Sequence, residues 1–137
     1  MNKYCLLIFC LLLAPISHAQ VLIVNPDNID TDLSLNTVRS IFAMRTHQWS
    51  DGSPIHVFVL EDNDNLHSDF CKEILKVFPY QLRRLWDKQI FSGTGVAPTT
   101  VKSIEEMRER VANTKGAIGY IRKEQLTDTI KQIGMPL

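Results

Sequence analysis

Residues 57 to 70, VFVLEDNDNLHSDF, place three acids and two amides between a stretch typical of a strand and one typical of a helix. The acids are Glu61, Asp62 and Asp64, and the amides are Asn63 and Asn65. Their oxygen atoms are ligands that Ca²⁺ prefers. The spacing departs from a calcium loop, because Leu66 stands fifth from Asp62 and no glycine stands sixth. A cation site and a solvated loop remain alternatives, and we predict no metal.

The same junction precedes a predicted helix start, where free backbone N–H groups bind anions. Asn65 or Ser68 would cap the helix, the Ser68 hydroxyl would add a donor, and His67 would add charge when protonated. A helix start contributes about 0.3–1 kcal/mol, whereas one carboxylate ~4 Å away costs about 4 kcal/mol at an effective dielectric constant of about 20. An anion site at Asn65, His67 and Ser68 therefore requires that the acids turn away or that arginines offset them.

Catalytic motifs of the hydrolase, zinc-protease, dithiol and P-loop types do not occur in the sequence, so we predict neither an enzyme nor a cofactor. Cys71, His67 and Asp69 have the residue types of a nucleophile and base, but they are not expected all to face one another near a helix start. Cys71 is expected to be a buried hydrophobe, with a reactive thiol as the alternative. His47 and His56 have no second ligand at a metal-binding spacing.

The N-terminus has the pattern of a cleavable signal peptide, with Lys3, an apolar core and a small-x-small site before a cut after Ala19. A lipoprotein signal ending at Cys10 is the alternative, and the bulky Phe9 argues against it. We therefore expect residues 20–137 to form a single exported, periplasmic domain. Cys71 would be its one cysteine, without an internal disulfide partner.

Charge and composition exclude one class of partner. The 15 basic and 15 acidic residues balance, so the chain lacks the basic excess that nucleic-acid binding requires.

Strand-like and helix-like stretches alternate along the chain. Strands are predicted at 21–25, 54–60, 117–121 and 129–133, and helices at 33–44, 70–78, 82–90 and 103–111. Ser34 is expected to cap the helix at 33–44, and the Ser103–Glu106 pair the helix at 103–111. Pro79 is expected to end the helix at 70–78, and Gly116 to end the last helix. The order β-α-β-α-α-α-β-β predicts an α/β domain with a small mixed sheet flanked by helices.

Three patterns in chain order carry a family resemblance: IF…W.DGSPI, W…F.G…P and the late GAIGY. Together they resemble the phosphate-binding proteins of ABC transporters, and most closely the short, single-lobe proteins labelled phosphate transporter substrate-binding proteins. The resemblance implies one lobe of a periplasmic-binding-protein fold, a small anion such as phosphate as ligand, and a membrane transporter as partner.

The resemblance also places the family's phosphate loop. In the full-length family, the loop after the strand equivalent to HVFVL resembles Arg-Ser-x-Gly-Ser-Gly-Thr and wraps phosphate, whereas this chain has EDNDNLHSDF there. Leu60 or Glu61 stands in place of the arginine, and Ser68 is the hydroxyl left near the helix start. Ser92, Gly93 and Thr94 are secondary candidates, although they match a later loop of the family.

Two functions follow as hypotheses. The first is an exported module that binds phosphate or another small anion at Asn65, His67 and Ser68. The alternative is an adaptor of a cell-envelope complex that has lost its ligand, for which an exposed apolar patch or a homodimer would be evidence.

Overall fold

The computed structural model describes residues 19–93 and 95–135. Apart from Ala19, the predicted signal peptide lies outside the described residues, and so does the anion candidate Thr94. Within the described part, no helix is both long and apolar enough to span a membrane.

Five strands form one mixed sheet in the order β3-β2-β4-β1-β5. They are β1 (Gln20–Val24), β2 (His56–Leu60), β3 (Thr99–Val101), β4 (Ala117–Arg122) and β5 (Lys131–Ile133). Strand β2 runs parallel to β3 and β4, whereas β1 runs antiparallel to β4 and β5. All five residues of β1 are buried, as expected for a strand covered on both faces.

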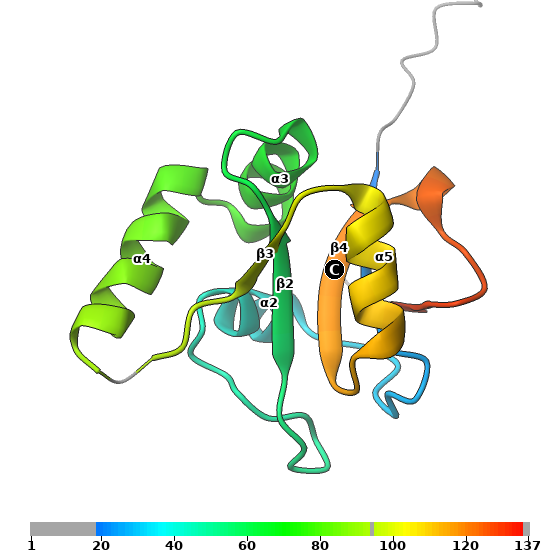
Figure 1. Cartoon of the computed structure of the whole chain (residues 1–137). Helices are drawn as coiled ribbons and strands as arrows, with labels where there is room; N and C mark the ends of the chain where they lie inside the picture. Colours follow the sequence, from blue (N-terminus) through cyan, green and yellow to red (C-terminus); the bar gives the residue numbers. More distant parts are fainter. Residues whose placement is uncertain (1–18, 94, 136–137) are drawn as a thin grey trace, which may run out of the picture.

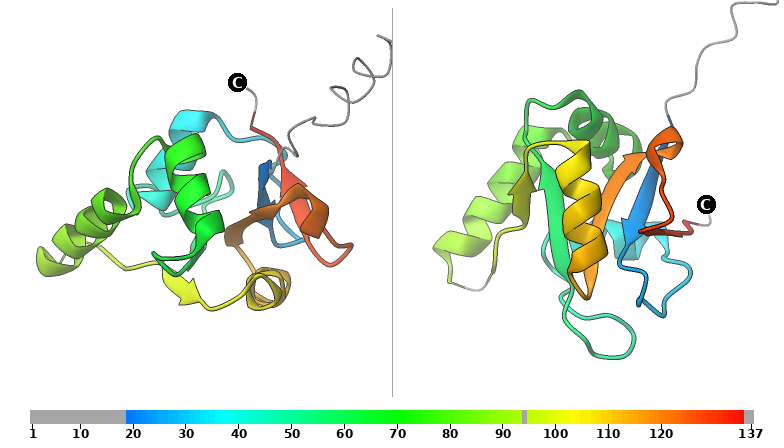
Figure 2. Two further views of the ribbon diagram at one scale, coloured as in Figure 1. Left: turned by 90° about the horizontal axis from the view of Figure 1, so that it is seen from above. Right: turned by 45° about the vertical axis from the view of Figure 1, so that its right-hand side comes forward.

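Helices cover both faces of the sheet (Figures 1 and 2). They are α2 (Leu35–Phe42), α3 (Asn65–Phe70), the π-helix η2 (Cys71–Leu75), α4 (Pro79–Phe91), α5 (Ile104–Asn113) and the 3₁₀ turn η3 (Lys123–Gln125). Seen from above, α5 lies on one face of the sheet, and α2 and α3 lie on the other (Figure 2). Helix α4 lies against η2 beside the β3 edge.

The α/β class and most predicted elements are confirmed, including two helix caps. The Ser34 side chain accepts a hydrogen bond from the Thr37 amide, and that of Ser103 accepts one from the Glu106 amide. The prediction for Pro79 was wrong. The helix before it ends with η2 and a left-handed Lys76 (φ 60°), and Pro79 opens α4, because proline suits the first turn of a helix.

Strand β3 was not predicted. Its three residues are too few for a period-two pattern to stand out, and the strand forms because Phe58–Leu60 of β2 pair with it in parallel.

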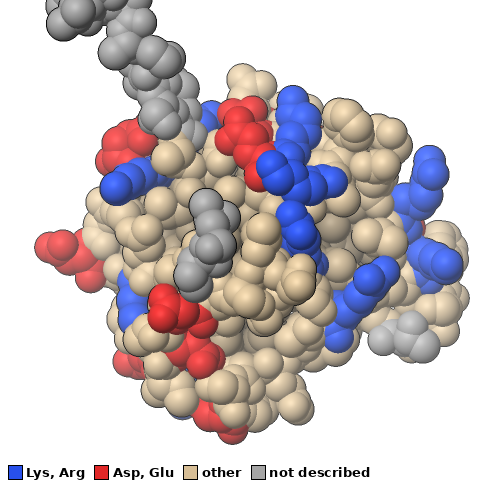
Figure 3. Space-filling model, turned by 180° about the vertical axis from the view of Figure 1, so that it is seen from behind, with Lys and Arg blue, Asp and Glu red and all other residues tan. Residues whose placement is uncertain are grey.

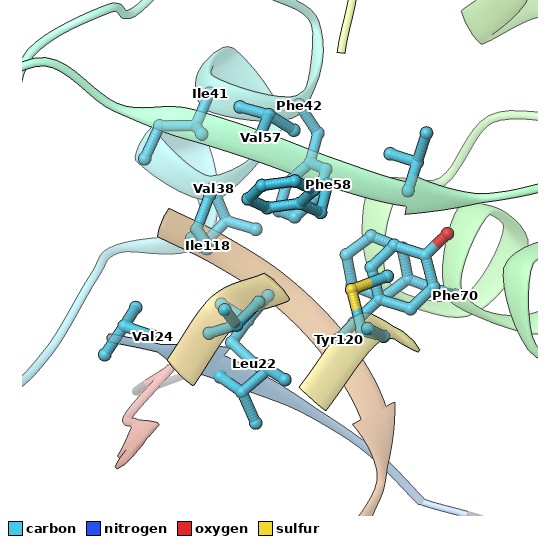
Figure 4. Close-up of a cluster of buried hydrophobic side chains, with 14 of the residues drawn as sticks. Leu22, Val24, Val38, Ile41, Phe42, Val57, Phe58, Phe70, Ile118 and Tyr120 are labelled. Carbon is cyan, nitrogen blue, oxygen red and sulfur yellow. The ribbon is translucent and has the colours of Figure 1, made fainter. Parts of the chain in front are cut away.

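An aromatic cluster occupies the core between the sheet and the α2–α3 layer (Figure 4). The rings of Phe70 and Tyr120 stack with centroids 4.0 Å apart, and Phe42 meets Phe70 edge-on at 4.9 Å. On the other face of β4, a Cβ on Gly119 would lie 2.5 Å from the Met107 sulfur, so glycine lets α5 approach the sheet closely. The junction between β2 and α3 therefore rests on a tightly packed base.

Candidate functional site

Asp64 caps α3 and fills the helix start with a carboxylate of the protein itself. Its Oδ1 accepts hydrogen bonds from the backbone amides of Leu66 at 2.8 Å and His67 at 3.2 Å. We predicted Asn65 or Ser68 as the cap, and that prediction was wrong. Asp64 has the extended backbone that a cap requires, whereas Asn65 and Ser68 lie within the helix.

Asp62 is held by an arginine from α4. The Arg83 guanidinium donates two hydrogen bonds to the Asp62 carboxylate, each of 3.0 Å, in the bidentate geometry typical of strong arginine–carboxylate pairs. Hydrogen bonding to Asp62 raises the pKa of Arg83. One of the three loop acids is thus offset by an arginine, so the condition stated above for an anion site is met at Asp62 only.

The imidazole of His67 points into the core, not toward solvent. The side chain is fully buried, and its Nδ1 is hydrogen-bonded to the Tyr120 hydroxyl. That hydroxyl also accepts a hydrogen bond from the backbone N–H of Leu60, with 2.9 Å between nitrogen and oxygen. The site therefore joins β2, α3 and β4. Burial lowers the pKa of His67, although Asp62 and Asp64 act in the opposite direction. At neutral pH the ring is therefore neutral and supplies no positive charge to the helix start.

Cys71 lies one turn after His67 and faces it. Its Sγ is 3.4 Å from Nε2 of His67, because residues four apart share a helix face. Asp69 faces elsewhere and pairs with Arg122 at 3.4 Å. Burial raises the pKa of the Cys71 thiol to about 12, so the thiol stays protonated at neutral pH. The expectation that Cys71 is buried is confirmed, and the His67–Cys71 pair lacks the thiolate that nucleophilic chemistry needs.

The remaining predicted residues lie in two places. Asn65 is exposed and Ser68 half-buried, so both stay accessible near the start of α3 while His67 does not. Ser92 and Gly93 follow the C-terminal end of α4, where the Ser92 hydroxyl donates to the Gln89 carbonyl at 2.9 Å. Carbonyl groups collect at such an end, which disfavours an anion. Among the described residues, no group of three His, Cys, Asp or Glu side chains is arranged to hold a metal ion.

Sequence reasoning missed the partners that define this site. Tyr120 was predicted only as part of the strand at 117–121, and Arg83 only as part of the helix at 82–90. The His67–Tyr120 and Asp62–Arg83 contacts join residues 53 and 21 positions apart. Local spacing carries no signal for contacts of this range.

The arrangement defines an α/β lobe with a capped helix start at the end of a parallel strand. A family model described as the PBP superfamily domain matches residues 17–133. The chain belongs to this family. No curated protein matches the sequence.

Solved structures with the same fold include proteins described as phosphate-transport receptors. A putative phosphate ABC transporter substrate-binding protein from Clostridium perfringens, with bound phosphate, matches at a TM-score of 0.69 and 21% identity over 85% of this chain. An ABC-type phosphate transport receptor from Vibrio cholerae matches at a TM-score of 0.66 and 18% identity over 83% of this chain. PstS from Borrelia burgdorferi matches at a TM-score of 0.65 and 17% identity over 85% of this chain.

The match covers 46%, 44% and 47% of those three chains, in the same order. The chain thus spans less than half the length of these relatives, and its fold is that of one lobe. The predicted resemblance and fold class are confirmed.

Proposed function

We propose that this chain is an exported binding-protein lobe of the cell envelope that acts through contacts with another protein. In this proposal Asp64 occupies the position at which the family resemblance places phosphate. The observation that carries it is that the Asp64 carboxylate accepts hydrogen bonds from the backbone amides of Leu66 and His67. An incoming anion would have to displace this group or meet a repulsion of about 4 kcal/mol at ~4 Å.

The surface formed by α4 and the segments on either side of it supports a protein partner. Large apolar side chains are exposed there, and Phe91 keeps 91% of its surface accessible. The others are Phe78, Tyr80, Ile90 and Val96. Exposed apolar surface of this kind is typical of an interaction site.

Phosphate binding is the second candidate function, with Asn65, Ser68 and a displaced His67 as its residues. The bound phosphate in the Clostridium perfringens relative favours it, and so does the Arg83 guanidinium beside Asp62. In this version the protein would deliver a small anion to a membrane transporter. Both versions include periplasmic export with cleavage after Ala19.

Calorimetry with inorganic phosphate in a chelating buffer separates the two functions. We expect no saturable heat for the wild-type protein up to millimolar phosphate. Asp64→Ser should gain binding, because serine still caps the helix while the competing charge is removed. The matched control is Asp128→Ser, which removes an exposed acid from the loop before β5.

Saturable binding of micromolar phosphate by the wild-type protein would contradict the first proposal. If Ser68→Glu then abolished that binding, the phosphate site at the start of α3 would be established. If Asp64→Ser failed to bind while keeping its fold by circular dichroism, Asp64 would not be what blocks the site.

A further inference from the structure

A hollow lies between α2 and α4, with η2 beside it, away from the start of α3. Its volume is about 250 Å³. One wall is apolar and formed by Leu75, Val77, Leu82 and Leu85, whereas Arg39 and Arg45 supply charge on the α2 side. An apolar wall facing two guanidinium groups suits a ligand with one anionic end and one hydrocarbon end.

Arg39 provides the sharpest polar feature of this hollow. Its Nε atom is buried and has no hydrogen-bond partner among the described residues. A buried charged donor without an acceptor is costly, and a guanidinium presents its donors in a fork that matches a carboxylate. The Nε atom itself is closed to solvent, but Arg39 as a whole is only half-buried, so a carboxylate in the hollow would bond to the outer nitrogen atoms of its guanidinium.

The backbone around the hollow is strained at two points. Met44 and Lys76 are the non-glycine residues with positive φ in the described chain, both at 60°. Met44 directly precedes Arg45, and Lys76 directly precedes Val77. A left-handed conformation costs a non-glycine residue about 1–3 kcal/mol and collects at ligand sites.

The charge around the hollow has one sign. An adjoining hollow shares Val77 and is lined by Lys72 and Lys76, and among the described residues no acidic side chain lines either space. Figure 3 shows Lys and Arg side chains over the upper and right parts of the back of the molecule, with most Asp and Glu toward the left and below. In a chain whose charges balance overall, this local excess attracts anions.

We propose that the α2–α4 hollow binds a short aliphatic monocarboxylate. The carboxylate bonds to Arg39 and Arg45, and the alkyl chain packs on Leu82 and Leu85. Hexanoate, with one carboxylate and a short alkyl chain, is the probe for this class of ligand. Inorganic phosphate fits poorly, because the apolar wall would remove its hydration without replacing it.

Calorimetric titration of the purified protein with hexanoate tests the proposal. We expect saturable binding that Arg39→Met weakens by about tenfold or more, because methionine keeps the apolar stem but loses the charged hydrogen bonds. The matched control is Lys88→Met on the exposed side of α4, which should bind as the wild-type protein does. Hexan-1-ol and hexylamine should bind far more weakly than hexanoate.

Three results would overturn the proposal. They are no saturable heat with hexanoate, equal affinity for hexanoate and hexan-1-ol, and an unchanged affinity in a folded Arg39→Met variant. If Arg39→Met does not fold, Arg45→Met serves instead, because Arg45 is exposed and its replacement leaves the core intact. Unchanged hexanoate affinity in Arg45→Met would then remove the carboxylate site.

Discussion

His67 is a titratable side chain in a fully buried position, so the stability of the protein depends on its protonation. Burial lowers the pKa of His67 in the folded state below its ordinary value of 6.5. Between these two values the unfolded chain binds more protons than the folded one, so the free energy of unfolding falls as the pH falls. Above 6.5 the contribution of His67 is constant.

His67→Gln should therefore show a smaller loss of stability on acidification than the wild-type protein. Urea unfolding at several pH values from neutral to about pH 5 measures this slope. His56→Gln is the control, because His56 is exposed at the first position of β2. Equal slopes for wild type and His67→Gln would show that His67 does not couple folding to pH.

At the scale of elements, Gly116 fixes the path from α5 into β4. Its φ is +79°, and a Cβ there would lie 2.3 Å from the Pro54 carbonyl oxygen. Its own carbonyl accepts the indole N–H of Trp49 at 3.0 Å. Gly116→Ala should lower the free energy of unfolding by about 2–4 kcal/mol, through both backbone strain and overlap with Pro54.

Gly52 provides a matched control for this prediction, since its φ is +84° and a Cβ there would meet no atom within 4 Å. Gly52→Ala should cost about 1 kcal/mol, from backbone strain alone. Urea denaturation of both variants measures the difference. Equal losses would mean that the close approach to Pro54 contributes nothing.

Several helices and strands could be predicted from the sequence alone. The first helix, the last helix and strands β1 and β2 follow from local signals: side-chain periodicity, capping serines and β-branched residues. The sequence indicated the β2–α3 junction as the candidate site, but it did not predict how the side chains there are oriented. His67 turns inward because Tyr120, 53 positions away, offers a hydrogen bond. Asp64 was counted as a repulsive acid, although it serves as the cap.

At the scale of the whole molecule, the proposed protein contact through α4 predicts self-association or capture of a partner through the same surface. Sedimentation of the wild-type protein over a wide concentration range should show dimers that Phe91→Ser weakens. Ile29→Ser is the control, since Ile29 is 65% exposed in the loop after β1. A wild-type protein that stays monomeric throughout would exclude the homodimer and leave a different chain as partner.

The order of strands in the sheet also bears on when this protein folds. In the described chain, β1 bonds to β4 and β5, with Gln20 opposite Arg122 and Leu22 opposite Ile133. Contacts between such distant segments carry a large loop-closure cost and form late. While the ribosome is still adding the second half of the chain, β1 has neither neighbour. Pairing of β1 must therefore follow synthesis of β4 and β5, and until then the unpaired edges of β1 stay open to chaperones.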